Sequence, residues 1–195
     1  MKIDNVKVYD LEESIIASGL PKLTAYDGNV FEAQARNITY DGGCDRHMQR
    51  ANTLANTPIG SGHNNFLSGI VVSMNITATI KWWEQFQRYH FKQIVSSMST
   101  MHRLRRMAIE GTLQFNELTD RGVIAAFVEL AKDETVTDEK LAYSCPSGLE
   151  LTARITTNYL QLKTQYAQRR NHKLGEWHTY CNLIETLPYA KEFIV

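Results

Sequence analysis

Apolar and polar side chains alternate along residues 70–80, IVVSMNITATI. Every even-numbered position in this stretch is apolar, and positions 73, 75, 77 and 79 are Ser, Asn, Thr and Thr. A period of two is typical of a β-strand that buries one face and leaves the other near solvent. We therefore expect a half-buried strand over these residues.

The period changes in the segment that follows, KWWEQFQRYHF. Trp82, Phe86 and Tyr89 recur at helical spacing, so the strand is expected to lead directly into an amphipathic helix. The polar face of this helix would present three side chains at positions i, i+3 and i+7, namely Gln85, Arg88 and Lys92.

The remainder of the chain predicts strands and helices together. A strand is expected over 6–10, and helices over 11–19, 45–56, 117–133, 136–144, 153–170 and 174–187. Thr119 or Asp120 is suited to cap the helix at 117–133. Residues 26–62 are otherwise rich in Asn, Asp, Gly and Thr, as in loops. Without repeats or a low-complexity linker, this order predicts one α+β domain spanning residues 1–195.

Composition narrows the classes of function. The 195 residues contain 21 Lys plus Arg and 21 Asp plus Glu, so no global field attracts nucleic acid or an anionic membrane. No stretch reaches transmembrane length, and the N-terminus has acidic residues where a signal peptide needs an apolar core. The odd number of cysteines, without CxxC spacing, argues against a disulfide framework or a zinc site. We expect a cytoplasmic protein.

Basic side chains gather locally between residues 81 and 106. The cluster consists of Arg88, His90, Lys92, His102, Arg103, Arg105 and Arg106, and the hydroxyl-rich run SSMST lies within it. Guanidinium and hydroxyl groups together suit a phosphate, which arginine binds through two parallel hydrogen bonds. The alternative is a solvated helix face followed by a polar turn.

Other candidate residues carry weaker signals. His63 follows Gly-Ser-Gly and is either a ligand contact or a turn residue. Arg169 and Arg170 end a predicted helix, where cations also favour the helix dipole without any ligand. No HExxH, GxSxG or phosphate-loop motif occurs, and Cys44 near His47 is weak evidence for a thiol nucleophile. We expect no metal site.

Two ordered blocks of these residues resemble the flavin-dependent thymidylate synthases. That family has a histidine before a strand, then a helix ending in Q-x-x-R-H-R, then serines and an arginine; GSGHNNF supplies His63, and QFQRYHF supplies Gln85 and Arg88. The second block is a proline, an asparagine and an arginine that closes a helix. Pro146, Asn158 and Arg169 lie at compatible spacings. The blocks cover about half of the chain.

The resemblance implies an antiparallel or mixed sheet flanked by helices, and reductive methylation of dUMP. The carbon would come from methylenetetrahydrofolate and the hydride from FAD reduced by NADPH. The substrate contacts that it implies are Gln85, Arg88, Ser97, Ser99, Arg103 and Arg169, with Arg169 as the catalytic cation that polarises the pyrimidine. The flavin contacts that it implies are His63, Arg88, His90 and Asn158. Family members are homotetramers, so we expect a homo-oligomer.

The chain also departs from the family pattern. Tyr89 and His90 replace a histidine and an arginine of the family's run, the serines reach register only after an insertion, and Ala142 replaces a phosphate-binding arginine, for which Arg154 is a possible substitute. Two alternatives therefore stay open: a non-catalytic protein that binds or sequesters a nucleotide, and a flavin enzyme that modifies another pyrimidine nucleotide.

Overall fold

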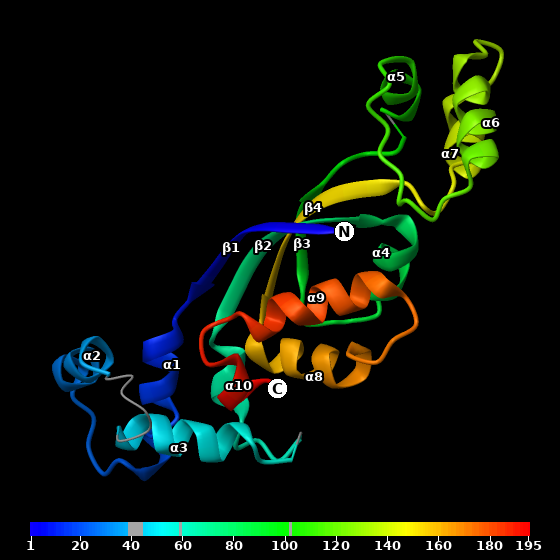
Figure 1. Cartoon of the computed structure of the whole chain (residues 1–195). Coiled ribbons are helices and arrows are strands. Elements are labelled where there is room, and N and C mark those ends of the chain that lie inside the picture. Colours follow the sequence, from blue (N-terminus) through cyan, green and yellow to red (C-terminus); the bar gives the residue numbers. More distant parts are fainter. Residues whose placement is uncertain (39–44, 59, 102) are drawn as a thin grey trace. The chain divides into compact units, whose positions relative to one another are not determined.

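The computed structural model describes residues 1–38, 45–58, 60–101 and 103–195, and Figure 1 traces their path. The chain divides into two compact units. The first unit contains Met1–Asp4, Met74–His90 and Ile94–Ile155, and the second contains Asn5–Ser73, Phe91–Gln93 and Thr156–Val195. The single domain expected from the sequence stays a prediction.

A four-stranded antiparallel sheet contributes residues to both units. Its strands, in spatial order, are β1 (Lys2–Tyr9), β2 (Val71–Thr79), β4 (Glu150–Asn158) and β3 (Gln93–Ser97). The sheet and the helices described below confirm the expected α+β class with an antiparallel sheet.

The alternation predicted for residues 70–80 is confirmed in β2. Its fully buried side chains are those of Val72, Met74, Ile76 and Ala78. The residues between them are half-buried, and two hydroxyl pairs join this polar face to β4. Ser73 and Thr156 are 3.1 Å apart, and Thr77 and Thr152 are 2.8 Å apart. Such cross-strand pairs fix the register of the two central strands.

The first unit has its own helices and its own apolar cluster. The helices are α4 (Ile80–Phe86), α5 (Leu104–Ile109), α6 (Arg121–Lys132) and α7 (Asp138–Tyr143). The cluster is formed by Leu104, Ala108, Phe127, Ala131, Val136, Leu141 and Leu149. Asp120 caps α6, because its Oδ1 accepts hydrogen bonds from the N–H groups of Gly122 (2.8 Å) and Val123 (3.1 Å). Of the two caps predicted from the sequence, Asp120 is therefore correct.

The second unit contains the remaining helices. These are α1 (Leu11–Ala17), η1 (Leu20–Lys22), α2 (Gly28–Arg36), α3 (Arg46–Ala55), η2 (Asn65–Ser68), α8 (Tyr159–Arg169), α9 (Gly175–Glu185) and α10 (Ala190–Phe193). Fully buried side chains include Tyr159, Trp177, Tyr180 and Phe193. The Tyr159 hydroxyl donates to the carbonyl of Pro188 at 2.8 Å, so this ring is buried with its polar atom satisfied.

The helix that follows β2 is shorter than predicted. α4 ends at Phe86, Arg88 lies in the turn after it, and Lys92 immediately precedes β3. The prediction that Arg88 and Lys92 share a helical face with Gln85 is therefore wrong. The hydroxyl-rich run begins within a strand, because β3 extends to Ser97.

The aromatic rings of this segment explain why the helical pattern was misleading. Trp82 and Phe86 are fully buried and stack with ring centres 4.6 Å apart. Tyr89 is also buried, with its ring 6.3 Å from that of Phe86, although its backbone has left the helix. Spacing alone indicates a shared apolar face, but a turn that folds back can bury a side chain at the same place.

The helix predicted over 153–170 is wrong in its first part. Residues 153–158 belong to β4, and α8 begins only at Tyr159. Ala153, Ile155 and Thr157 are buried in alternation, so a period of two precedes the helical period of α8. The strand predicted over 6–10 is also revised, because β1 begins at Lys2 and Asp10 takes a left-handed conformation with φ 61°.

α2 lies in the segment that was expected to be mostly loop. The Asp-Gly-Asn run at its start is typical of a turn, but the Asp27 side chain here caps a helix. Its Oδ1 accepts from the N–H groups of Asn29 at 2.9 Å and Val30 at 3.4 Å. The same short polar side chain serves either structure, so the local sequence does not distinguish them.

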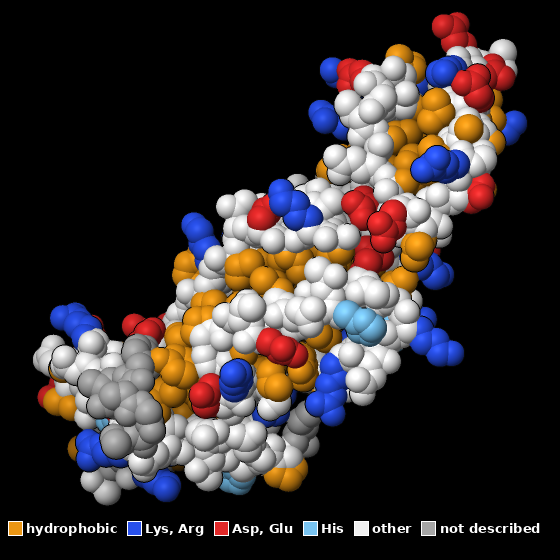
Figure 2. Space-filling model, in the orientation of Figure 1, with side chains coloured by type: hydrophobic (Ala, Val, Ile, Leu, Met, Phe, Trp, Pro, Cys, Tyr) orange, Lys and Arg blue, Asp and Glu red, His pale blue; other side chains and the backbone are white. Residues whose placement is uncertain are grey.

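Acidic and basic side chains are interspersed over the face shown in Figure 2, in keeping with the net charge of zero. In the described part of the chain, no helix has the length and apolar character needed to cross a membrane. Cys44 and His102, which the sequence singled out, lie outside the described residues.

Candidate functional site

A hydroxyl-rich hollow lies at the end of β3, in the first unit. Its volume is about 520 Å³, and its lining is Ser96, Ser97, Met98, Ser99, Arg103 and Thr152. The backbone N–H of Met98 donates to the Thr152 carbonyl at 3.0 Å, so pairing with β4 continues past the end of β3. The structure therefore brings together three residues that the sequence predicted as substrate contacts: Ser97, Ser99 and Arg103.

Arg103 supplies the positive charge of this hollow. It is exposed, and it precedes the first residue of α5. Among the described residues it has no ion-pair partner, whereas the nearby Arg106 donates to Glu110 at 2.7 Å. A guanidinium beside several hydroxyl groups matches the acceptor-rich surface of a phosphate.

Two smaller hollows share lining residues with the first. One, of about 230 Å³, includes the apolar residues Ile80, Trp83, Ile94, Leu151 and Ala153 and shares Ser97, Met98 and Thr152. The other, of about 240 Å³, shares Met98 and Arg103 and extends to Arg106, Met107, Glu110 and Thr112. An apolar compartment beside a cationic, hydroxyl-lined one is an arrangement that suits a ligand with a ring and a phosphate.

The other predicted contacts of the first unit lie outside the lining of this hollow. Gln85 is half-buried in α4, and Arg88 and His90 are exposed in the segment after it. Gln87, which the sequence reasoning missed, lines the apolar hollow instead. Gln87 is the C-cap of α4, and residues 87–88 form the turn that follows the helix.

His63 and Asn158 belong to the second unit. His63 is exposed in a turn between Gly62 and η2, and its backbone N–H approaches Ser61 Oγ at 3.4 Å. Gly62 has φ 79°, a left-handed conformation that favours glycine and so accounts for its place before His63. Asn158 caps α8, because its Oδ1 accepts from the N–H of Gln161 at 2.9 Å.

Arg169 is the last residue of α8 and is half-buried. Its Cζ lies 4.7 Å from the centre of the Trp177 ring in α9, which is a cation–π contact between the two helices. The His172 ring is 6.3 Å from the same indole, and burial, together with the charge of Arg169, lowers the pKa of His172. Arg169 is therefore a packed cation at a helix end.

Arg170 follows Arg169 directly and is not among the site residues that the resemblance implies. It is exposed at the C-cap of α8, and its Cζ lies 6.0 Å from the centre of the Tyr166 ring. The adjacent arginines thus differ in environment, which their sequence does not reveal. Thr152 was missed for another reason: it reaches the hollow through strand pairing, and no local motif marks it.

Two cysteines are described, and both are poorly reactive by environment. Burial raises the pKa of the Cys145 thiol and of the Cys181 thiol to about 11 each. A thiol with so high a pKa is protonated near neutral pH and is a weak nucleophile. Within the described ranges, no group of three or more His, Cys, Asp or Glu is placed to hold a metal ion.

Comparisons with known proteins bear on this geometry. No protein-family model matches the sequence, and no curated protein matches it significantly. Among solved structures, the chain is similar to a flavin-dependent thymidylate synthase, ThyX, from Helicobacter pylori, complexed with FAD and dUMP. The TM-score is 0.73 at 16% identity, covering 99% of this chain and 98% of that one. The chain has the ThyX fold.

Two further structures extend the comparison. A second Helicobacter pylori ThyX structure with FAD and dUMP gives a TM-score of 0.71 at 16% identity, with 100% of this chain and 97% of that chain covered. A UMP/dUMP methylase, PolB, from Streptomyces cacaoi, bound with 5-Br dUMP, gives 0.60 at 14% identity, with coverage of 95% and 89%. The resemblance drawn from two short sequence blocks is thus confirmed as a likeness of fold along the whole chain.

Proposed function

We propose that the protein is an FAD-dependent enzyme that reductively methylates dUMP, with methylenetetrahydrofolate as the carbon donor. The observation that carries the proposal is the hollow at the end of β3. It combines Ser97, Ser99 and Arg103, which the resemblance implies as substrate contacts. The full-length likeness to ThyX, crystallised with FAD and dUMP, supports the same chemistry.

In this proposal the nucleotide phosphate lies against the serine hydroxyls and Arg103. The hydroxyls donate to phosphate oxygens, and the guanidinium adds charge-assisted bonds. The adjoining hollow beside Trp83 is apolar enough to receive a pyrimidine ring. Gln85 and Arg88 are proposed as further substrate contacts, with Arg88 also contacting the flavin.

The donor set of the chain suits a flavin nucleotide. His63 and His90 are exposed imidazoles, and the Asn158 amide retains its Nδ2 donor after its oxygen caps α8. We propose that these three residues contact FAD. When bound, the reduced flavin would supply the hydride, with NADPH as the reductant of the flavin.

The polarising cation is proposed at the C-terminal end of α8. Arg169 is the residue that the resemblance implies, and its cation–π contact with Trp177, at 4.7 Å, restrains the guanidinium. A fixed cation beside a pyrimidine carbonyl stabilises the negative charge that develops as the ring reacts. The exposed Arg170 is the second candidate for this role.

A second candidate function is modification of another pyrimidine nucleotide, and the fold likeness to PolB, a UMP/dUMP methylase, favours it. The non-catalytic alternative is a nucleotide-binding protein on the same fold.

Tyr89, which replaces a histidine of the family's run, is weaker evidence against the enzyme than the sequence suggested. It is a buried core residue packed near Phe86. Its ring therefore has a structural role that needs no ligand.

The test begins with the absorbance of the purified protein. Bound flavin gives a visible absorption band, and colourless protein is reconstituted with FAD before assay. The protein with reduced flavin, dUMP and methylenetetrahydrofolate is then followed through a single turnover, with UMP in a parallel reaction. Thymidylate formation supports the synthase, while methylation of UMP alone supports the second candidate. Binding of dUMP without product in either reaction leaves the non-catalytic alternative and refutes the enzyme.

Assembly is a separate proposal. By resemblance we propose a homotetramer, to be measured by light scattering at micromolar concentration with dUMP present. A mass of about 22.3 kDa, that of one chain, would contradict it. A cytoplasmic location is likewise proposed from the composition alone.

A further inference from the structure

A second pocket lies in the second unit, formed by α1, η1, α2 and α3. Its volume is about 490 Å³, within the range of small-molecule sites. Its apolar lining is Ile16, Leu20, Leu23, Ala25, Tyr26, Val30 and Phe31. The polar lining includes Lys22, Asp27, Gln34, Arg46, His47 and Arg50. None of the residues assigned to the proposed function lines it.

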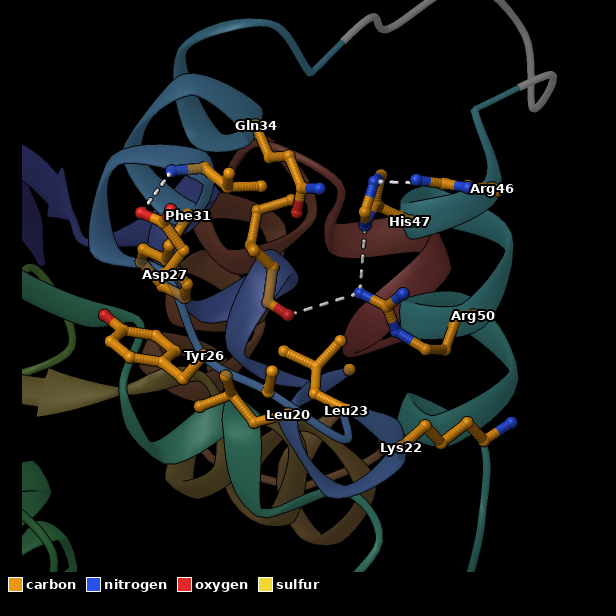
Figure 3. Close-up of a pocket in the computed structure, with 14 residues that line it drawn as sticks. Leu20, Lys22, Leu23, Tyr26, Asp27, Phe31, Gln34, Arg46, His47 and Arg50 are labelled. Carbon is orange, nitrogen blue, oxygen red and sulfur yellow. Dashed lines mark hydrogen bonds between the residues drawn. The ribbon is translucent and has the colours of Figure 1, made fainter.

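The two kinds of lining lie on opposite walls. Figure 3 shows Arg46, His47 and Arg50, all from α3, facing Tyr26 and Phe31 across the pocket. Leu20, Leu23, Tyr26 and Val30 are 41%, 57%, 67% and 51% exposed, which is unusual for large apolar side chains so close together. An occupant with an apolar body would remove this surface from water.

Arg50 is held in place by the protein. Its Nε donates to Ser18 Oγ at 3.0 Å, and its Nη2 donates to the carbonyls of Ile15 at 3.0 Å and Ile16 at 3.3 Å. The guanidinium also lies close to Gly19, where a Cβ would come within 2.7 Å of Cζ, so a side chain at this position would displace it. The three hydrogen bonds hold the cation in one place before any ligand binds.

The positive charge on this wall is partly offset by Asp45, whose charge acts on Arg50 and whose Oδ1 caps α3 by accepting from the N–H groups of His47 and Met48. Within the described residues neither Arg46 nor Arg50 forms an ion pair, although Arg50 is half-buried and burial lowers its pKa. Its Nη1 has no hydrogen-bond partner in the same part of the chain, so donors remain available. A half-buried cation that forms no direct ion pair is stabilised by an anion that shares its environment.

His47 lies between the two arginines of this wall. Its ring nitrogens face Arg46 Nε at 3.4 Å and Arg50 Nη2 at 3.3 Å, and burial and the Arg50 charge lower its pKa. Asp27 is the single carboxylate among the described lining residues. It lies on the opposite wall in Figure 3, and its Oδ1 already caps α2.

We propose that this pocket binds an amphiphilic carboxylate, with its apolar body against Leu20, Tyr26 and Phe31 and its carboxylate on Arg50 and Arg46. The opposed walls set the direction in which such a ligand enters, because both arginines lie on the α3 side. The size of the pocket limits the ligand to a medium alkyl chain or an aromatic ring system.

The test uses decanoate as the probe, below its micelle concentration, with calorimetry on the full-length protein. Decanol has the same chain without the charge, and butyrate has the charge without the chain. We expect saturable binding of decanoate and binding of decanol and butyrate that is at least about tenfold weaker, since charge and apolar contact both contribute.

Variants assign the contacts. Arg50→Gln should weaken decanoate about tenfold or more and leave decanol unchanged. Because Arg50 also anchors α1, Arg46→Gln is the second variant: Arg46 is exposed, and its loss should cost several-fold without unfolding. Lys22→Gln is the matched control, since its amine points away from the pocket in Figure 3. Affinity for dUMP, measured in parallel, should be unchanged in all three, which separates this site from the proposed function.

Absence of decanoate binding would overturn the proposal, as would equal binding of decanol or affinities that ignore both arginines. A third contrary result is self-association through this face. If Leu23→Asp converts an oligomer into monomers while decanoate binding is absent, the exposed apolar wall is an interface between copies of the chain.

Discussion

Neighbouring arginines occur at two places in the protein, and at both places they have different environments. In the first unit, Arg105 is bound to backbone carbonyls while Arg103 lines the hydroxyl-rich hollow. In the second unit, Arg169 packs on Trp177 while Arg170 is exposed. A cluster of basic residues in the sequence is therefore not one binding site. Each cation has to be assigned by the acceptors and rings that it reaches.

The acceptors explain the division in the first unit. Arg105 Nη1 donates to the carbonyls of Ala131 (2.7 Å) and Asp133 (3.0 Å), and its Nη2 donates to that of Val136. Carbonyl groups in the last turn of a helix have no partner within the helix, so a guanidinium from α5 satisfies one in the last turn of α6 and two in the segment after it. Arg105 thus connects α5 to the α6–α7 connection and has few donors left for a ligand.

The largest expected effect comes from removing this connection. Arg105→Ala should lower the free energy of unfolding by about 4 kcal/mol, because several carbonyl groups lose their donor and the ion pair with Asp138 is lost. Chemical denaturation monitored by circular dichroism measures the change. Arg106→Ala is the matched control, since its pair with Glu110 is exposed and should matter little. Equal stability of the two variants would contradict the structural assignment of Arg105.

The next largest effect concerns Arg103, the exposed arginine of the same cluster. Arg103→Gln should weaken dUMP binding by about 2 kcal/mol while leaving stability nearly unchanged, because a charge-assisted contact is lost at an exposed position. Calorimetry measures the affinity, with the exposed Arg121→Gln as a control in the same unit.

Arg88→Ala should weaken dUMP binding by about 2–5 kcal/mol if Arg88 binds the phosphate. Unchanged affinity in both variants would remove the hollow from the proposed site.

Parts of the fold were predictable from the sequence because local signals and burial agree. The alternation in β2 predicted its buried face correctly, and Asp120 predicted the start of α6. β4 was missed because a helical pattern begins at its end, and α2 because its capping Asp27 sits in a turn-like run. After Phe86 the helical spacing of apolar residues continues in the sequence, although α4 has already ended.

The residues of the candidate site also divide into those that the sequence predicts and those that it does not. The hydroxyl run and Arg103 were identified because they are close in sequence, so a short segment brings them together. Thr152 comes from a distant strand and carries no local signal. Arg169 and Arg170 were indistinguishable before the structure placed the Trp177 ring, since stacking depends on the packing of α8 against α9.

A smaller effect is expected from the arginines of the second unit. If Arg169 polarises the pyrimidine, Arg169→Lys should lower turnover about tenfold with little change in dUMP affinity, because the planar fork matters most in the transition state. If Arg170 has this role, Arg170→Lys should show that effect, and Arg169→Lys should show only a modest stability loss from the weaker contact with Trp177. Single-turnover flavin oxidation and thermal unfolding separate the two outcomes. Equal turnover in the wild type and both variants would exclude the end of α8 from catalysis.

The smallest effect is the pH dependence of stability that arises from one buried thiol in each unit. These are Cys145 in the first unit and Cys181 in the second. Burial raises both pKa values to about 11, above the value of about 8.5 for an unfolded thiol. The stability that these thiols contribute is therefore present below about pH 8.5 and is lost as the pH rises towards 11, because the unfolded chain releases the protons first. The free energy of unfolding should decline over this window, and less so in the variant with Cys145→Ala and Cys181→Ala.

Labelling of the same thiols compares the two units directly. In a Cys44→Ser background, single-thiol variants are treated with a disulfide reagent at pH 8. Cys145 is half-buried and should react slowly but directly, with a rate that rises about tenfold per pH unit, because only the thiolate attacks. Cys181 is 3% exposed within α9, so it should react only when the second unit opens, and low denaturant should accelerate it more than Cys145. If Cys181 reacts as fast as Cys145 without denaturant, α9 opens readily, and the packed position of Arg169 on Trp177 is too short-lived to orient a catalytic cation.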